Sequence, residues 1–188
     1  MFYFVFPVRG VEVARKHEYY LFSAISQIID IHDRNPKERI PIQITPITGV
    51  NNRDKIKITN KSYIKIIGIS VKEANQLQNK VLNINGNLVC LGSHILQSFE
   101  YSPSLFCRSV VLKDCFEPEK MAAEIKKLFS ENAKIEIGKK TFIKIKNVHK
   151  IGFQVKISNL DLNESINIQR YGVGMMRNMG CGNFYPVK

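Results

Sequence analysis

Four glycines lie within eleven residues near the C-terminus: Gly172, Gly174, Gly180 and Gly182. Glycine lets a backbone approach a phosphate closely and adopt a positive φ, so that successive N–H groups can converge on an anion. Arg170 and Arg177 lie beside and within this run and can add charge and bidentate donors. The pattern predicts a phosphate-holding loop, and the alternative is a tight hairpin with no ligand.

Known nucleotide and metal motifs do not account for this loop. Arg177 occupies the place of the third glycine of a dinucleotide G-x-G-x-x-G pattern, and no Gly-Lys-Ser/Thr follows for a nucleotide P-loop. The sequence has no H-E-x-x-H and no G-x-S-x-G, and its four cysteines form no C-x-x-C pair. We therefore expect neither a cofactor nor a metal site.

Basic and apolar residues alternate in several strand-like segments, which are 55–58, 61–66 and 142–146. With a period of two, Lys61, Tyr63 and Lys65 share one face of a strand. Phe142, Lys144 and Lys146 do the same, so we expect Lys144 and Lys146 to contact RNA. A solvated outer sheet face is the alternative for any one of these strands.

The four histidines, at positions 17, 32, 94 and 149, are the side chains best suited to move protons near neutral pH. His32 follows the first expected helix among Asp30, Asp33 and Arg34, where a loop can present it to bound RNA. His17 lies at helical spacing among apolar positions, so a buried structural role competes with a catalytic one. An RNA 2′-hydroxyl can attack its own phosphate when a base and an acid are supplied. We read His94 and His149 as structural or surface residues.

The charge of the chain points to a polyanionic partner. Its 188 residues carry 28 Lys and Arg against 16 Asp and Glu, for a formal net charge of +12 and a pI near 9.6. Nucleic acid is favoured over a membrane surface, because no apolar run approaches the roughly 20 residues that a transmembrane helix needs. The apolar start at 1–8 lacks the features of a signal peptide, and the scattered cysteines suit a reducing cytoplasm.

The elements that must position these residues repeat in two halves. In the first half we expect a strand at 2–8, a helix over 13–30, strands at 40–47 and 63–69, a helix at 71–79 and a hairpin about Asn85-Gly86. In the second we expect a strand at 106–112, a helix beginning at Pro118, strands at 134–145 and 152–157, and a helix capped by Asp161. This order predicts an α+β protein of two tandem ferredoxin-like (βαββαβ) domains with antiparallel sheets, at 1–100 and 105–188.

The stretch from Gly172 to Val187, with its Arg-x-Met-Gly-Cys-Gly-x-Phe core, resembles the signature of the CRISPR-associated endoribonucleases that process precursor guide RNA. This is the Cas-six family of the RAMP superfamily. Upstream, 6–10, 17–26, 31–32 and 46–49 resemble the N-terminal half of the same family, particularly its short MYXAN-type members. The resemblance covers nearly the whole chain.

The resemblance implies recognition of CRISPR repeat RNA and metal-independent cleavage that leaves a 2′,3′-cyclic phosphate and a 5′-hydroxyl. It implies that the glycine-rich loop contacts RNA and that a histidine near the first helix is catalytic, with His32 the first choice and His17 the second. Tyr19, Tyr20 and Arg9 are further candidates. The alternatives are a non-catalytic guide-RNA-binding subunit of a CRISPR effector complex and a basic module that binds an acidic protein. Other effector subunits and a second copy of the chain, in a homodimer, are further partners to consider.

Overall fold

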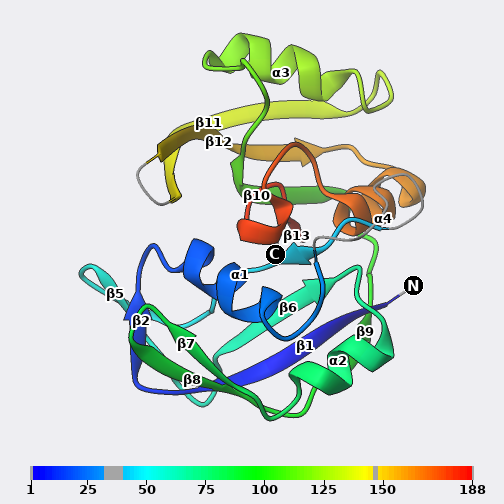
Figure 1. Ribbon diagram of the computed structural model, residues 1–188. Coiled ribbons are helices and arrows are strands. Elements are labelled where there is room, and N and C mark those ends of the chain that lie inside the picture. Colours follow the sequence, from blue (N-terminus) through cyan, green and yellow to red (C-terminus); the bar gives the residue numbers. More distant parts are fainter. Residues whose placement is uncertain (1, 32–39, 146–147, 188) are drawn as a thin grey trace. The chain divides into compact units, whose positions relative to one another are not determined.

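The chain forms two compact units, Met1–Ser98 and Phe99–Lys188, in a computed structural model that describes residues 2–31, 40–145 and 148–187 (Figure 1). The sequence placed its domains at 1–100 and 105–188. No helix among the described residues is both long and apolar enough to cross a membrane.

Unit 1, Met1–Ser98, is a mixed α/β unit with antiparallel strands. Its elements are β1 (Phe2–Arg9), β2 (Glu12–Ala14), α1 (Glu18–Ser26), β3 (Gln43–Ile44), β4 (Val50–Asn52), β5 (Lys55–Lys57), β6 (Tyr63–Ile67), α2 (Val71–Leu77), β7 (Val81–Ile84), β8 (Asn87–Leu91) and β9 (Ile95–Ser98). The main sheet has the order β3-β6-β1-β8-β7, and β9 also pairs with β1. β1 is therefore the middle strand, with β6 on one side and β8 and β9 on the other, and side chains such as Phe6 and Ile64 are fully buried.

The first helix begins later than the sequence suggested. We predicted a helix from Val13, but Val13 lies in β2 opposite Ile56 of β5, and α1 runs only from Glu18 to Ser26. Val13 and Ile56 are both buried, so the β-branched side chain is packed in a small sheet rather than on a helix. The start of the predicted range was wrong, because a single apolar residue five positions before the helix fits the spacing of a strand as well as that of a helix.

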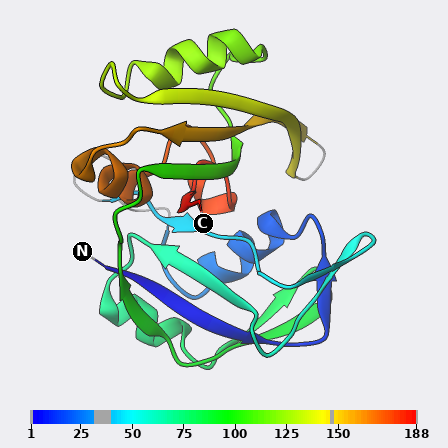
Figure 2. The same ribbon diagram turned by 180° about the vertical axis from the view of Figure 1, so that it is seen from behind.

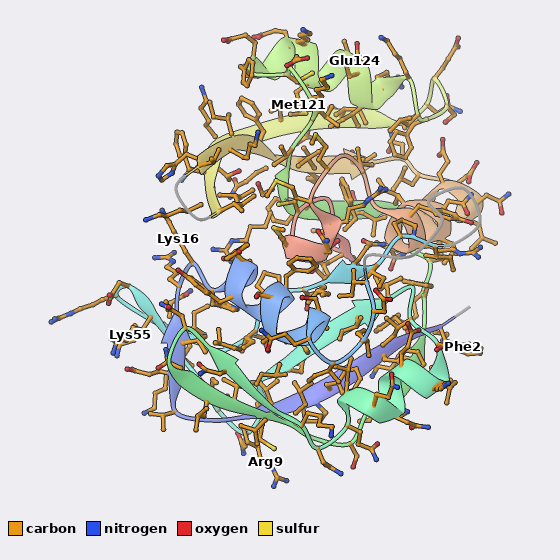
Figure 3. All side chains as sticks on the ribbon, in the orientation of Figure 1. Phe2, Arg9, Lys16, Lys55, Met121 and Glu124 are labelled. Atoms are coloured by element: carbon orange, nitrogen blue, oxygen red, sulfur yellow. The ribbon has the colours of Figure 1, made fainter. Side chains whose placement is uncertain are left out.

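The small sheet, β2-β5-β4, carries two lysines, Lys55 and Lys57, on β5. In β5, Ile56 is buried between exposed Lys55 and Lys57, as the alternation predicted. Lys55 is paired with Glu12 of β2, and Figure 3 shows Lys55 projecting outward from this sheet. The pairing raises the pKa of Lys55 through a hydrogen bond and charge attraction from Glu12.

Unit 2, Phe99–Lys188, has the order β10 (Ser104–Val110), α3 (Pro118–Lys126), β11 (Lys134–Ile145), β12 (Val148–Ser158), α4 (Leu162–Tyr171), the 3-10 turn η1 (Arg177–Met179) and β13 (Phe184–Pro186). All four strands are antiparallel, in the order β11-β12-β10-β13. Met121 of α3 is completely buried in the core of this unit, while Glu124 lies on the other side of the helix (Figure 3).

The helix boundaries of unit 2 follow local signals that the sequence shows. Pro118 lies in the first turn of α3, where a missing N–H costs nothing. Asp161 caps α4 by accepting from the Glu164 N–H, and Glu164 returns the bond to the Asp161 N–H. These two predictions are confirmed.

The strand pairing in the sheet of unit 2 has two irregularities. The register shifts in β10 between Cys107 and Val110, and in β11 between Ile137 and Lys140. A bulge bends a strand and frees backbone groups from the ladder. The C-terminal loop uses the carbonyl of Ser109 within the bulge of β10 and that of Val111 just after the strand.

Candidate functional site

The glycine-rich loop starts where α4 ends and folds back onto β10. Gly172, with φ of 63°, ends α4, and its N–H donates to Ile168 O at 2.9 Å. Farther along, the Met175 N–H donates to Val111 O and the Gly182 N–H donates to Ser109 O, each at 2.8 Å. The loop is therefore fixed at both ends to the bulged end of β10. Figure 2 shows it from behind as the red segment after α4.

Two of the glycines are required by close approach of the chain to itself. A Cβ on Gly174 would lie 2.3 Å from Val111 O, and one on Gly182 would lie 2.0 Å from Val173 O. Both glycines also have positive φ, at 83° and 64°. A side chain at Gly174 would push the loop away from Val111, and one at Gly182 would push the two ends of the loop apart.

The N–H groups that remain for an anion lie in the middle of the loop. Met176 is left-handed, with φ of 61° and ψ of 32°, and the 3-10 turn follows directly. Successive left- and right-handed residues point neighbouring N–H groups into one concavity, which suits an anion. Within the part of the chain that the structure describes, the N–H groups of Met176, Arg177 and Asn178 have no acceptor. The sequence expected this role for the glycines, but the N–H groups of Gly172 and Gly182 are bonded inside the protein.

The two predicted arginines meet at one tyrosine. The Arg170 guanidinium carbon lies 4.8 Å from the centroid of the Tyr171 ring, and Arg177 donates from Nη1 to Tyr171 O at 2.9 Å. Tyr171 keeps 40% of its surface exposed. Partial burial lowers the pKa of Arg177 by desolvation, yet a guanidinium stays charged at neutral pH. The structure thus brings together a cluster of two cations and an exposed ring, which we call the Arg–Tyr–Arg cluster.

Tyr171 was missing from the candidates that the sequence supplied. The sequence does contain a signal for Tyr171, because an aromatic residue between Arg170 and Gly172 lies directly before the glycine-rich loop. Ser109 was missed as well, and no sequence pattern identifies it, because its role depends on the bulge in β10. Its Oγ lies 2.6 Å from Thr141 Oγ1 of β11, and its carbonyl holds Gly182.

The β11–β12 hairpin presents a second basic surface. Phe142 and Lys144 are exposed on one face, as predicted, and Lys144 pairs with His149 of β12. Lys139, Lys140 and Lys150 are exposed nearby. Lys146 lies outside the described residues. The hairpin therefore offers several cations and an exposed aromatic ring to a polyanion.

His17, one of the two candidate catalytic histidines, is fully buried at the start of α1. Its Nδ1 lies 2.9 Å from Ala14 O, and its Nε2 accepts from the Ile47 N–H at 2.9 Å. A proton on Nδ1 and none on Nε2 satisfies both contacts, so the ring has the neutral form. This geometry ties α1 to β2 and to the segment before β4, and it holds both nitrogens in structural bonds.

The other candidates are placed as follows. His32 lies outside the described residues. Tyr19 and Tyr20 stack edge to face on α1, with centroids 5.5 Å apart, and Arg9 is exposed at the end of β1 (Figure 3). His94 packs against the rings of Phe4 and Phe6 in a structural role, and His149 is exposed. No group of three metal-binding side chains forms within 2–31, 40–145 or 148–187.

The fold and the site define a class of basic, mixed α+β protein with antiparallel sheets and a C-terminal glycine-rich loop. The family model of Cas6, described as Cas6 Crispr, matches residues 4–188. The chain therefore belongs to the Cas6 family of CRISPR-associated endonucleases.

Among curated proteins, the chain is similar to the CRISPR-associated endonuclease Cas6 of Myxococcus xanthus (strain DK1622). The two are 28% identical over 187 residues, which is 97% of this chain and 80% of the relative.

Solved structures share the fold. A structure described as "An RAMP protein binding different RNA substrates" matches with a TM-score of 0.71, at 10% identity and full coverage of both chains. Cse3 of Thermus thermophilus, bound to an RNA representing a pre-cleavage complex, matches with a TM-score of 0.57 at 11% identity, over 98% of this chain and 97% of that one. The likeness to RAMP proteins agrees with the resemblance found in the sequence.

Proposed function

We propose that this protein is an endoribonuclease that binds CRISPR repeat RNA and cleaves precursor crRNA without a metal ion. In this proposal the 2′-hydroxyl beside the cut attacks the phosphate, and the products carry a 2′,3′-cyclic phosphate and a 5′-hydroxyl. Both units are ferredoxin-like domains, a view supported by the βαββαβ order of unit 2 and by the likeness to RAMP proteins.

The observation that carries the proposal is the Arg–Tyr–Arg cluster beside the three N–H groups of Met176, Arg177 and Asn178. Charged and amide donors that converge on one loop can bind a phosphate and stabilise the charge that develops during attack. The exposed Tyr171 ring adds a surface on which a base can stack. An ordinary tight hairpin requires neither the cations nor the free N–H groups.

Proton transfer is assigned to His32. One group must take the proton of the 2′-hydroxyl, and one must protonate the leaving 5′-oxygen. We assign His32 to one of these steps, because both nitrogens of His17 are engaged in structural bonds. His17 is then a positioning residue, which fixes the start of α1.

The β11–β12 hairpin supplies affinity through Lys144 and its basic neighbours, and Lys146 continues the same strand pattern. Such contacts to the RNA backbone release counterions, so binding should weaken steeply as salt rises. The proposal that RNA is the partner is supported by the structure of Cse3, which is bound to an RNA.

The arginine cluster is tested by RNA affinity. The variants Arg170→Gln and Arg177→Gln should each weaken binding of repeat RNA about tenfold to a hundredfold, because each removes a charged hydrogen bond to phosphate. Each should also reduce the slope of log affinity against log salt by about one. Arg53→Gln, an exposed arginine of unit 1, is the charge-matched control. Equal loss in all three variants would show that only net charge matters.

The histidine assignment is tested by single-turnover cleavage, with the protein in saturating excess over the RNA. His32→Ala should slow the cut by about 10²- to 10⁴-fold and leave affinity nearly unchanged. His149→Ala, an exposed histidine without a role in the chemistry, should cut at the normal rate. A His32→Ala protein that cuts normally would disprove the assignment, and a wild-type protein that binds without cutting would favour the non-catalytic subunit.

A further inference from the structure

The sheet of unit 1 carries a cluster of aromatic and basic side chains that the proposed cleavage site does not use. Tyr3 lies on β1, the middle strand, and Tyr63 and Lys65 lie on the adjacent strand β6. Lys65 Nζ lies 4.9 Å from the centroid of the Tyr3 ring and 5.9 Å from that of Tyr63. A single ammonium group therefore lies between two rings.

These side chains share one face of the sheet. Val5 pairs with Lys65 and Pro7 pairs with Tyr63, so Tyr3, Val5 and Pro7 point to the same side as Tyr63 and Lys65. Phe4, Phe6 and Ile64 point to the opposite side and are buried in the core. The residues of the cluster are partly exposed, so their rings and charge reach the surface.

The chemistry of this face suits a single-stranded nucleic acid. Among described residues of β1, β6, β8 and β9 that point to this side, none is acidic, and Arg9 adds a second cation at the far end of β1. Tyr3 donates to Gln97 Oε1 at 3.0 Å, which leaves the amide NH₂ of Gln97 to meet a base carbonyl. From Tyr3 to Arg9 the strand extends about 20 Å, enough for a few nucleotides.

We propose that the Tyr3–Lys65–Tyr63 face of unit 1 is a second RNA-binding surface, which holds an unpaired stretch of the bound RNA by stacking bases on the two tyrosines. Lys65 lies between the rings and meets the phosphate that joins the stacked bases. Aromatic side chains on the two central strands of a four-stranded sheet stack bases in the same manner in RNA-recognition modules. Stacking tolerates any base, so the surface favours unpaired RNA over a particular sequence. The inference rests on the proposed function only in taking the ligand to be RNA.

The test uses a fluorescein-labelled 12-nucleotide oligouridine, which cannot form a hairpin. The double variant Tyr3→Leu/Tyr63→Leu should bind it about fivefold to a hundredfold more weakly for each lost stack, and Lys65→Gln should also weaken binding. Phe2→Leu, on the opposite face of β1, and Lys72→Gln, on α2, are the matched controls and should bind normally. Ultraviolet crosslinking followed by mass spectrometry should join uridine to Tyr3 or Tyr63.

Two results would overturn the inference. One is unchanged affinity of the double variant with crosslinks only in unit 2. The other is no binding of oligouridine by the wild type. This face, which also exposes Ile95 and Leu88, would then be interpreted as a protein-binding surface. Cleavage of saturating repeat RNA by the double variant separates the two proposals. If the double variant still cuts and still binds oligouridine as the wild type does, only the second RNA-binding surface is disproved. If the wild type never cuts, the cleavage proposal fails, and oligouridine binding still tests the second surface.

Discussion

Replacing Gly182 by alanine tests whether the glycine-rich loop is built by close approach of its two ends, at Val173 and Gly182. The new Cβ would lie 2.0 Å from Val173 O, more than an ångström closer than an ordinary contact. The backbone at Gly182 also has φ of 64°, which an L side chain rarely adopts. Gly182→Ala therefore adds a steric clash to a conformational cost.

The size of the effect follows from these two terms. A positive φ costs an L-residue about 1–2 kcal/mol. Relieving the clash breaks the bonds from the Val173 N–H to Gly182 O and from the Gly182 N–H to Ser109 O, each worth about 1 kcal/mol. Gly182→Ala should thus lower the free energy of unfolding by about 3–4 kcal/mol, or displace the loop and lose RNA affinity while the unit stays folded.

Gly86→Ala is the matched control, because Gly86 has φ of 85° and no atom within 4 Å of its Cβ position. It should cost only the conformational term, about 1–2 kcal/mol, and leave RNA binding unchanged. Urea unfolding and repeat-RNA binding of both variants are the measurements. Gly174→Ala, with a Cβ 2.3 Å from Val111 O, repeats the test should Gly182→Ala not fold. If Gly182→Ala proves as mild as Gly86→Ala in both assays, the account of the loop is refuted.

Three further predictions concern single side chains. His17→Ala should lower the free energy of unfolding by about 2–4 kcal/mol in urea titrations, because the Ile47 N–H and Ala14 O lose their partner in the core. An unchanged midpoint of unfolding would contradict the structural role. Burial raises the pKa of Glu164, but N–H donors, foremost that of Ser130, outweigh it and leave a net lowering. Its capping bonds therefore stabilise the fold fully above its ordinary pKa of 4.5. At pH 7 the wild type should be more stable than Glu164→Gln by about 1 kcal/mol, and this difference should shrink as the pH falls through the lowered pKa. Thermal melts of both proteins at pH 7 and pH 3 measure the difference. Burial raises the pKa of Cys107 to about 12. Alkylation at pH 8 should therefore modify the half-buried Cys90 and spare Cys107. Equal labelling of both cysteines would contradict the burial of Cys107.

Local signals made parts of the fold predictable. Asp161 with Glu164 marks the start of α4, and Asn85-Gly86 marks the β7–β8 hairpin, where Ile84 pairs with Asn87. Both depend on a few neighbouring residues. The strand β9, by contrast, was not expected, because Ile95–Ser98 is exposed along its whole length and shows no alternation.

The site was only partly predictable, for the same reason. Arg170 and Arg177 were found because charge beside glycine is visible in the sequence. The separate roles of the loop residues were not predictable, since Gly182 packs against Val173 and donates its N–H to Ser109 O in the bulge of β10, while the free N–H groups belong to Met176, Arg177 and Asn178. Long-range contacts of this kind leave no pattern in a single sequence.

The most direct test of the central claim is a single-atom change in the RNA. Repeat RNA with 2′-deoxyribose at the nucleotide before the cut should bind as tightly as the unmodified strand and remain uncut, in buffer with EDTA, while the unmodified strand yields a cyclic phosphate. Cleavage of the deoxy substrate would contradict attack by the RNA's own hydroxyl, and loss of all cleavage when EDTA is added would contradict cleavage without a metal ion.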